Sequence, residues 1–219
     1  MTDNKKKAIV LAGSRGIGKS IADALEKINM QVDALSSKEL DSSNLDQCRK
    51  LCVTHEAVDV LVLNTGGPPA KKFNDITIDD WDKYHRQLFL GFVTILQNLK
   101  INDGGFIFLI SSYNIKEPDP NLILSNTYRI AFVSLLKSLS PQFAANEISC
   151  INIAPGPMNT DRFKELNDDP IAVGKTFPMK RVGCPDEIGR FVSSIVENDI
   201  SYLTGVTINF DGAISKGIL

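Results

Sequence analysis

Short apolar runs alternate with longer amphipathic stretches along most of this chain of 219 residues. This alternation is typical of repeated strand–helix units, and continuous apolar runs are typical of parallel strands that are covered on both faces. The apolar runs predict strands at Ala8–Ala12, Gln31–Leu35, Val58–Leu63, Gly105–Ile110, Ile148–Ile153 and Val206–Phe210. The amphipathic stretches predict helices at Gly16–Asn29, Asn44–His55, Thr77–Leu99, Asn121–Asn146 and Pro185–Val196. We therefore expect an α/β fold, a doubly wound parallel sheet flanked by helices, in one domain over residues 1–219.

The pattern is abnormally short after the second predicted strand, where only Ser36–Ser43 precede the next helix. Adjacent parallel strands need a crossover of about a dozen residues or more, so a helix and a third strand at Lys38–Asp41 cannot both fit. We predict a sheet that is trimmed around the second and third strand region. The least regular segment, Asp161–Val182, is interpreted either as a mobile flap over a site or as a surface connection.

Composition excludes some classes of protein. The apolar fraction of 43% and the charged fraction of 23% are ordinary for a soluble globular protein, and the net charge of −2 disfavours nucleic acid or a membrane surface as the main partner. No window approaches about 18 apolar residues, and the N-terminus lacks the apolar core of a signal peptide. The cysteines show no zinc-like spacing: Cys48, Cys52, Cys150 and Cys184. We expect a reduced, cytoplasmic protein without a metal site.

A glycine-rich turn, AGSRGIG, joins the first predicted strand to the first predicted helix. Gly16 and Gly18 allow the backbone to approach a pyrophosphate closely, and the helix N-terminus offers that group free N–H donors and a positive dipole. A glycine-rich turn alone is a weak signal, but here it stands in the strand–turn–helix context that dinucleotide binding requires. The turn therefore predicts a dinucleotide cofactor.

The same turn resembles the TGxxxGxG motif of the short-chain dehydrogenases/reductases, with Leu11 and Ala12 at its threonine and first glycine. Further motifs resemble the family in the same order along nearly the whole chain: VLVLNTGG, LISS, INIAPGPMNT, PMKRVGCPDEIG and YLTGVTINFDGA. The resemblance implies a Rossmann-type fold, a nicotinamide cofactor, a small-molecule substrate and a homodimer or homotetramer. The helix over Asn121–Asn146 supports an oligomer, because its apolar residues cover more than one buried face.

The resemblance also indicates which positions contact the cofactor. They are Gly13, Ser14, Arg15, Gly16, Ile17, Gly18, Ser36, Ser37, Asp41, Asn64, Gly66, Pro155, Gly156, Met158 and Thr160. The tip of the second strand reads Ser36-Ser37-Lys38, while Asp33 lies inside the strand. Together with Arg15 in the turn, these groups suit a 2′-phosphate, so we expect NADP(H) rather than NAD(H).

The catalytic positions of the family are eroded in this chain. The family uses an asparagine, a serine, a tyrosine and a lysine, and the matching positions here are Leu88, Ser112, Ser125 and Arg129. Only the serine is retained. A serine hydroxyl does not titrate near neutrality as a tuned phenol can, and an arginine is a fixed cation rather than a proton carrier. The standard carbonyl–alcohol chemistry of the family is therefore in doubt.

Three interpretations remain open. The first is a reductase of enones, in which Ser112 and Arg129 stabilise an enolate and water protonates carbon. The second is a carbonyl reductase that recruits Tyr113 as its acid, since Tyr128 lies about 100° around the helix from Arg129 and faces elsewhere. The third is a catalytically impaired nucleotide-binding or regulatory protein. A substrate pocket is expected between the Ser112 loop and residues 161–182, with an apolar lining: Met158, Phe163, Phe177 and Pro118.

Overall fold

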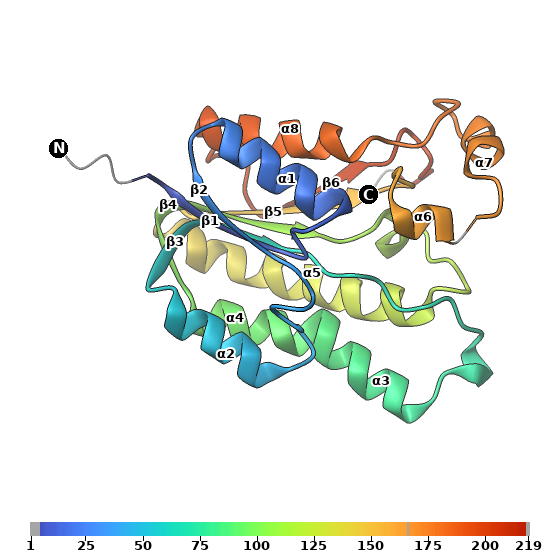
Figure 1. Ribbon diagram of the computed structural model, residues 1–219, viewed down its shortest axis with the longest axis horizontal. Coiled ribbons are helices and arrows are strands. Elements are labelled where there is room, and N and C mark those ends of the chain that lie inside the picture. Colours follow the sequence, from blue (N-terminus) through green and yellow to red (C-terminus); the bar gives the residue numbers. More distant parts are fainter. Residues whose placement is uncertain (1–4, 166, 218–219) are drawn as a thin grey trace.

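The computed structural model describes residues 5–165 and 167–217, and its strands form one parallel sheet (Figure 1). The strand order is β2-β1-β3-β4-β5-β6. The strands are β1 (Lys7–Leu11), β2 (Gln31–Leu35), β3 (Ala57–Leu63), β4 (Lys100–Ile110), β5 (Ser149–Pro155) and β6 (Val206–Phe210). Because β2 and β3 lie on opposite sides of β1, the order reverses there, and such a switch point is where open α/β sheets bind ligands. The predicted doubly wound parallel sheet is confirmed.

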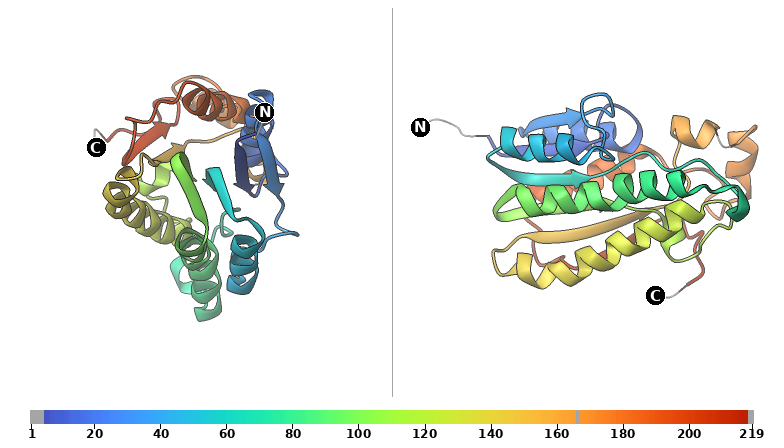
Figure 2. Two further views of the ribbon diagram at one scale, coloured as in Figure 1. Left: turned by 90° about the vertical axis from the view of Figure 1, so that its left-hand side faces the viewer. Right: turned by 90° about the horizontal axis from the view of Figure 1, so that it is seen from below.

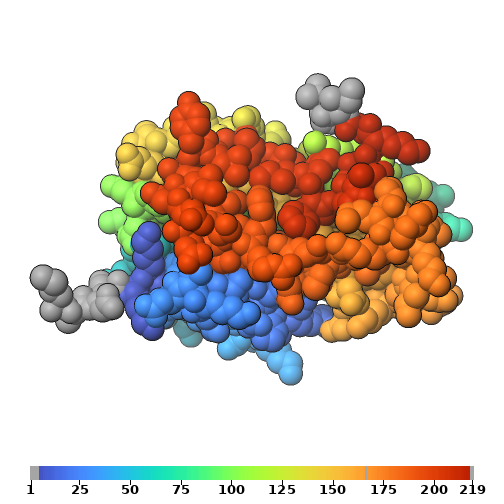
Figure 3. Space-filling model, turned by 90° about the horizontal axis from the view of Figure 1, so that it is seen from above, coloured from blue at the N-terminus to red at the C-terminus, as the bar shows by residue number. Residues whose placement is uncertain are grey.

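Helices cover both faces of the sheet (Figures 1 and 2). Helices α1 (Gly16–Lys27) and α8 (Pro185–Glu197) pack on one face and lie side by side, as the blue and orange-red surfaces in Figure 3 show. Helices α2 (Leu45–Thr54), α4 (Gly91–Asn98) and α5 (Ile123–Ala144) bury their apolar residues on the opposite face. The sheet is thus the middle of three layers, which explains why its strands are nearly continuous apolar runs.

The trimmed edge of the sheet is confirmed. Residues 36–44 form turns without a strand, and the chain passes from β2 directly into α2, which leaves β2 as the edge strand. Leu40 and Ser42 within this connection are buried, so the connection is anchored against the body of the molecule.

The helix expected over Thr77–Leu99 is not one regular α-helix. It consists of α3 (Ile78–His85), a π-helical turn at Arg86–Leu90 and α4. The π turn adds a residue and rotates the later part of the helix relative to α3. This prediction is corrected because hydrophobic periodicity does not reveal a single inserted residue.

The segment Asp161–Val182 contains two short helices, α6 (Asp161–Glu165) and α7 (Pro170–Thr176). Asp169 caps α7 by accepting from the N–H groups of Ile171 and Ala172. Single turns of 3₁₀-helix occur at Phe73–Asp75 and at Tyr113–Ile115, directly after β4 and Ser112. The strands are parallel, so the segments that follow β1, β3, β4 and β5 all leave the sheet on the side of its carboxyl-terminal strand ends.

Candidate active site

The glycine-rich turn forms an open cradle at the carboxyl end of β1. Ala12 adopts a left-handed conformation with φ of 48°, and Gly16 has φ of 55°. A Cβ built on Gly18 would lie 2.2 Å from the carbonyl oxygen of Ala12, so only glycine fits there. No side chain caps the N-terminus of α1, and its first turn holds no acidic residue. The N–H groups are therefore free to bind a pyrophosphate, and the residues fit a dinucleotide.

The structure brings the expected cofactor motifs together. Cγ2 of Thr160 lies 3.3 Å from the position of a Cβ on Gly16, and Nδ2 of Asn64 lies 2.9 Å from that of Gly18. Gly13 donates its N–H to the carbonyl of Leu35 at the end of β2. The expected positions therefore surround the switch point: Ser14 and Arg15 are exposed in the turn, Ile17 packs on the core, Pro155 ends β5, Gly156 bonds to β6, and Met158 is buried behind Thr160.

The tip of β2 carries a carboxylate that the sequence did not indicate. The N–H and the hydroxyl of Ser36 both donate to Oε2 of Glu39, at 2.8 and 2.7 Å, and these bonds lower the pKa of Glu39. Ser37 and Lys38 are exposed beside them. Asp33 points away from the tip, as expected, and pairs with His55. Asp41 accepts from the backbone and the hydroxyl of Ser43.

Arg129 joins α5 to the ends of β3 and β4. Its Nε donates to Oγ of Ser125 at 3.1 Å, Nη1 donates to the carbonyls of Ile110 and Ser111 at 2.8 and 3.2 Å, and Nη2 donates to the carbonyl of Thr65 at 3.3 Å. Burial lowers the pKa of Arg129 to about 10, so the group stays charged at neutral pH. No carboxylate in the described part of the chain forms an ion pair with it.

The hydroxyl oxygens of the two serines of the site, Ser112 and Ser125, each accept one hydrogen bond. Oγ of Ser125 accepts a hydrogen bond from Nε of Arg129, and Oγ of Ser112 accepts one from the N–H of Asn114 at 3.2 Å. Neither hydroxyl donates to a group within residues 5–165 and 167–217. A serine hydroxyl has one proton to donate, so both serines retain a donor for a ligand. Arg129 holds Ser125 next to the strand end from which Ser112 follows.

The two tyrosines near the site lack a partner that would activate them. Burial raises the pKa of Tyr113, and the carboxylates of Asp119, Glu117 and Asp211 raise it further. A catalytic phenol needs the opposite influence from a nearby cation. Tyr128 donates its hydroxyl to the carbonyl of Trp81 at 3.1 Å, which confirms that it faces elsewhere.

Leu88 is buried against Tyr84 and Leu124, so no polar side chain stands at the family's asparagine position. The neighbouring Gln87 donates instead to Oγ1 of Thr65 and to the carbonyl of Gly66. Sequence reasoning missed Gln87, because its type and spacing match no motif. It appears only once the helix and the loop after β3 are packed together.

The segment that follows Thr160 reaches back over the site. Nη2 of Arg162 in α6 donates to the carbonyl of Pro68, in the loop after β3, at 2.8 Å. The contact supports the interpretation of residues 161–182 as a cover over a site.

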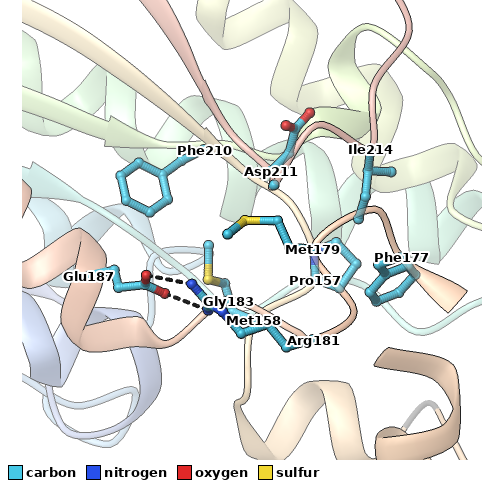
Figure 4. Close-up of a pocket in the computed structure, with 11 residues that line it drawn as sticks. Pro157, Met158, Phe177, Met179, Arg181, Gly183, Glu187, Phe210, Asp211 and Ile214 are labelled. Carbon is cyan, nitrogen blue, oxygen red and sulfur yellow. Dashed lines mark hydrogen bonds and ion pairs between the residues drawn. The ribbon is translucent and has the colours of Figure 1, made fainter. Parts of the chain in front are cut away.

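A hollow lies between this segment, α8 and the end of β6 (Figure 4). It includes Met158 and Phe177 of the expected apolar lining, but Phe163 and Pro118 do not line it. This hollow opens beside Phe210 and the Arg181–Glu187 ion pair rather than beside the Ser112 loop, so the place of Phe163 and Pro118 in a substrate pocket stays a prediction.

Comparisons with known proteins agree with this geometry. A family model described as "Enoyl-(Acyl carrier protein) reductase" matches residues 21–215. The nodulation protein G of Azospirillum brasilense is 27% identical, covering 97% of this chain and 99% of that protein. The NADPH-dependent reductase BacG of Bacillus subtilis is 26% identical over 98% of this chain and all of its own length.

A solved short-chain dehydrogenase from Burkholderia cenocepacia, in complex with NADP, superposes with a TM-score of 0.83 at 21% identity, covering 94% of this chain and 96% of that one. Among the described residues, no helix is long and apolar enough to cross a membrane. Because the family model matches most of the chain and the fold is the expected one, this protein belongs to the short-chain dehydrogenase/reductase family.

Proposed function

We propose that the protein is an NADP(H)-dependent reductase of small enones that works without a phenolic acid. The observation that carries this proposal is the pair of serines, Ser112 and Ser125, each of which keeps a hydroxyl proton free. Arg129 places a partly buried positive charge next to Ser125. Two donors backed by a cation are suited to stabilising negative charge that develops on a substrate oxygen.

The missing phenol favours an enone over a simple ketone. Reduction of a ketone leaves an alkoxide that needs a proton on oxygen at once, and a serine hydroxyl is a poor acid at neutral pH. In conjugate reduction the nicotinamide, when bound, supplies a hydride to the β-carbon, and the electron pair of the double bond moves to give an enolate. The serines hold the enolate oxygen while water protonates the α-carbon. The sum consumes one NADPH and one proton, and yields NADP⁺ and the saturated ketone.

Several observations support NADP(H) as the cofactor. Arg15, Ser37 and Lys38 are exposed near the expected position of a 2′-phosphate. One relative is described as NADPH-dependent, and one structural neighbour was solved with NADP. The contact of Glu39 with Ser36 opposes this choice, so Glu39 must turn away if the phosphate uses the donors of Ser36.

A catalytically impaired nucleotide-binding protein is the second candidate. One observation favours it: three of the four hydrogen bonds of Arg129 end on backbone carbonyls, as in a purely structural arginine. A carbonyl reductase that uses Tyr113 has less support, since burial and three nearby carboxylates all raise the pKa of that phenol.

The decisive experiment is a measurement of NADPH oxidation with matched pairs of enones and the corresponding saturated ketones. We expect turnover of enones and none of the ketones. Turnover of ketones would favour the Tyr113 mechanism, and a Tyr113→Phe variant would then lose it. Binding of NADPH without turnover of either class would favour the nucleotide-binding protein.

A further inference from the structure

The π-helical turn Arg86–Leu90 presents the side chain of Gln87 to the loop after β3. Its Nε2 donates to Oγ1 of Thr65 at 3.0 Å and to the carbonyl of Gly66 at 2.9 Å. One amide thus uses both protons on two consecutive loop residues. π-helical turns are rare and occur frequently at functional sites, so this contact needs an explanation beyond helix geometry.

Thr65 connects Gln87 with Arg129. Its hydroxyl accepts from Gln87, while its backbone carbonyl accepts from Nη2 of Arg129 at 3.3 Å. Since Nε of Arg129 donates to Ser125, hydrogen bonds that end on two different atoms of Thr65 link the π turn to Arg129 and through it to Ser125. The link passes from one helix to another through a single loop residue.

The other side of Gln87 is fixed by the connection between β2 and α2. The buried hydroxyl of Ser42 donates to the carbonyl of Gln87 at 3.1 Å and lies 3.4 Å from Oγ1 of Thr65. A Cβ on Gly91 would come within 2.0 Å of the carbonyl oxygen of Ser42, so the connection packs directly on the π turn. Gln87 therefore has contacts on both sides, through its side chain to the loop after β3 and through its backbone carbonyl to Ser42.

We propose that Gln87 is a positioning residue, which holds Thr65 so that Arg129 keeps its orientation toward Ser125. An arginine side chain has many rotamers, so Arg129 can hold one orientation only if its hydrogen-bond acceptors are fixed in place. Thr65 is the one acceptor of Arg129 that lies on a loop rather than on its own helix or at the end of β4. Gln87 supplies the stiffness that this loop lacks. Only the catalytic use of the fixed Arg129 rests on the proposed function, and the positioning role of Gln87 does not.

Gln87→Leu tests the proposal, because it removes both donors at a similar volume. Gln97→Leu is the matched control, since Gln97 is exposed on α4 of the same helical segment. The direct readout is the side-chain Nε–H signal of Arg129 in an NMR spectrum, identified by its loss in Arg129→Lys. We expect exchange of that proton with water to become at least about tenfold faster in Gln87→Leu and to stay unchanged in Gln97→Leu.

Kinetics give a second readout on the same variants. We expect kcat for the enone to fall by about 10- to 100-fold in Gln87→Leu, while the Kd for NADPH changes by less than about threefold. Thr65→Val removes the Oγ1 acceptor and should show a smaller loss of the same kind, and Thr65→Ser should restore it. If Gln87→Leu does not fold, the comparison of Thr65→Val with Thr65→Ser replaces it.

An unchanged exchange rate for the Arg129 proton in a folded Gln87→Leu protein would overturn the proposal. A fall in kcat without any change of that proton would overturn it as well, because the effect would then bypass Arg129. If the wild-type protein reduces no enone, the proposed function fails while the NMR comparison still decides the role of Gln87.

Discussion

At the scale of single residues, the site places a fixed positive charge beside a serine hydroxyl. The family positions for tyrosine and lysine hold Ser125 and Arg129, which bond to each other at 3.1 Å. Arginine cannot pass a proton on at neutral pH, but its charge strengthens the Ser125 hydroxyl as a donor by polarising the oxygen. The spacing of these residues was enough to identify them, whereas their contact, and the three carbonyls that hold Arg129, required the structure.

Ala12 occupies a backbone conformation that favours glycine, with φ of 48°. We expect Ala12→Gly to raise the free energy of unfolding by about 1 kcal/mol. The energy of the left-handed backbone at Ala12 exceeds the free-energy cost of the extra conformational entropy that glycine loses on folding. Urea unfolding measures the change. Ala131→Gly, on the exposed face of α5, is the control with the opposite sign and should cost about 1 kcal/mol. Equal destabilisation by both variants would show that Ala12 is not strained.

At the scale of elements, the strands were predictable because each is a buried apolar run with few alternatives. The length of the connection after β2 also sufficed to predict the trimmed edge, since chain reach is a simple geometric limit. The π turn was not predictable, because Tyr84 before it, Leu88 within it and Phe92 after it are all buried, so the apolar pattern continues through the insertion. Gln87, the residue that the turn presents, was missed for the same reason.

The packing of the π turn makes a testable statement about Gly91. We expect Gly91→Ala to destabilise the protein by about 1–3 kcal/mol, because its Cβ would come within 2.0 Å of the Ser42 carbonyl oxygen. Helix propensity alone would favour alanine, so the sign of the change is informative. Gly67→Ala is the control, since no atom lies within 4 Å of its Cβ, and it should change stability by less than about 0.5 kcal/mol. Chemical denaturation of both variants checks this, and a stabilised Gly91→Ala would refute the close packing.

At the scale of the whole molecule, the outer surface of α3, α4 and α5 remains partly apolar. Phe132 and Leu136 are buried in the core, but Ile130 is 44% exposed and Val133 is only half-buried. The excess of apolar residues on this helix was visible in the sequence, whereas the structure was required to show which of them stay exposed.

We expect a homodimer or homotetramer in solution, with this surface buried between copies. Light scattering at micromolar concentration measures the mass. Ile130→Glu should shift the protein toward a smaller species, while Lys27→Glu, at an exposed position of α1 on the opposite face of the sheet, should not. A monomeric wild-type protein would contradict the expectation.

Hydride transfer in the two serine variants tests the central claim most directly. The measurement is the single-turnover oxidation of bound NADPH by an enone, in the wild-type protein and in Ser112→Ala and Ser125→Ala, with the Kd for NADPH determined in parallel. The account predicts that each variant slows the transfer by about 100-fold or more at nearly unchanged NADPH affinity, as removal of an oxyanion donor does. Transfer at the wild-type rate in both variants would show that the oxygen's charge is held elsewhere, and the account would be wrong.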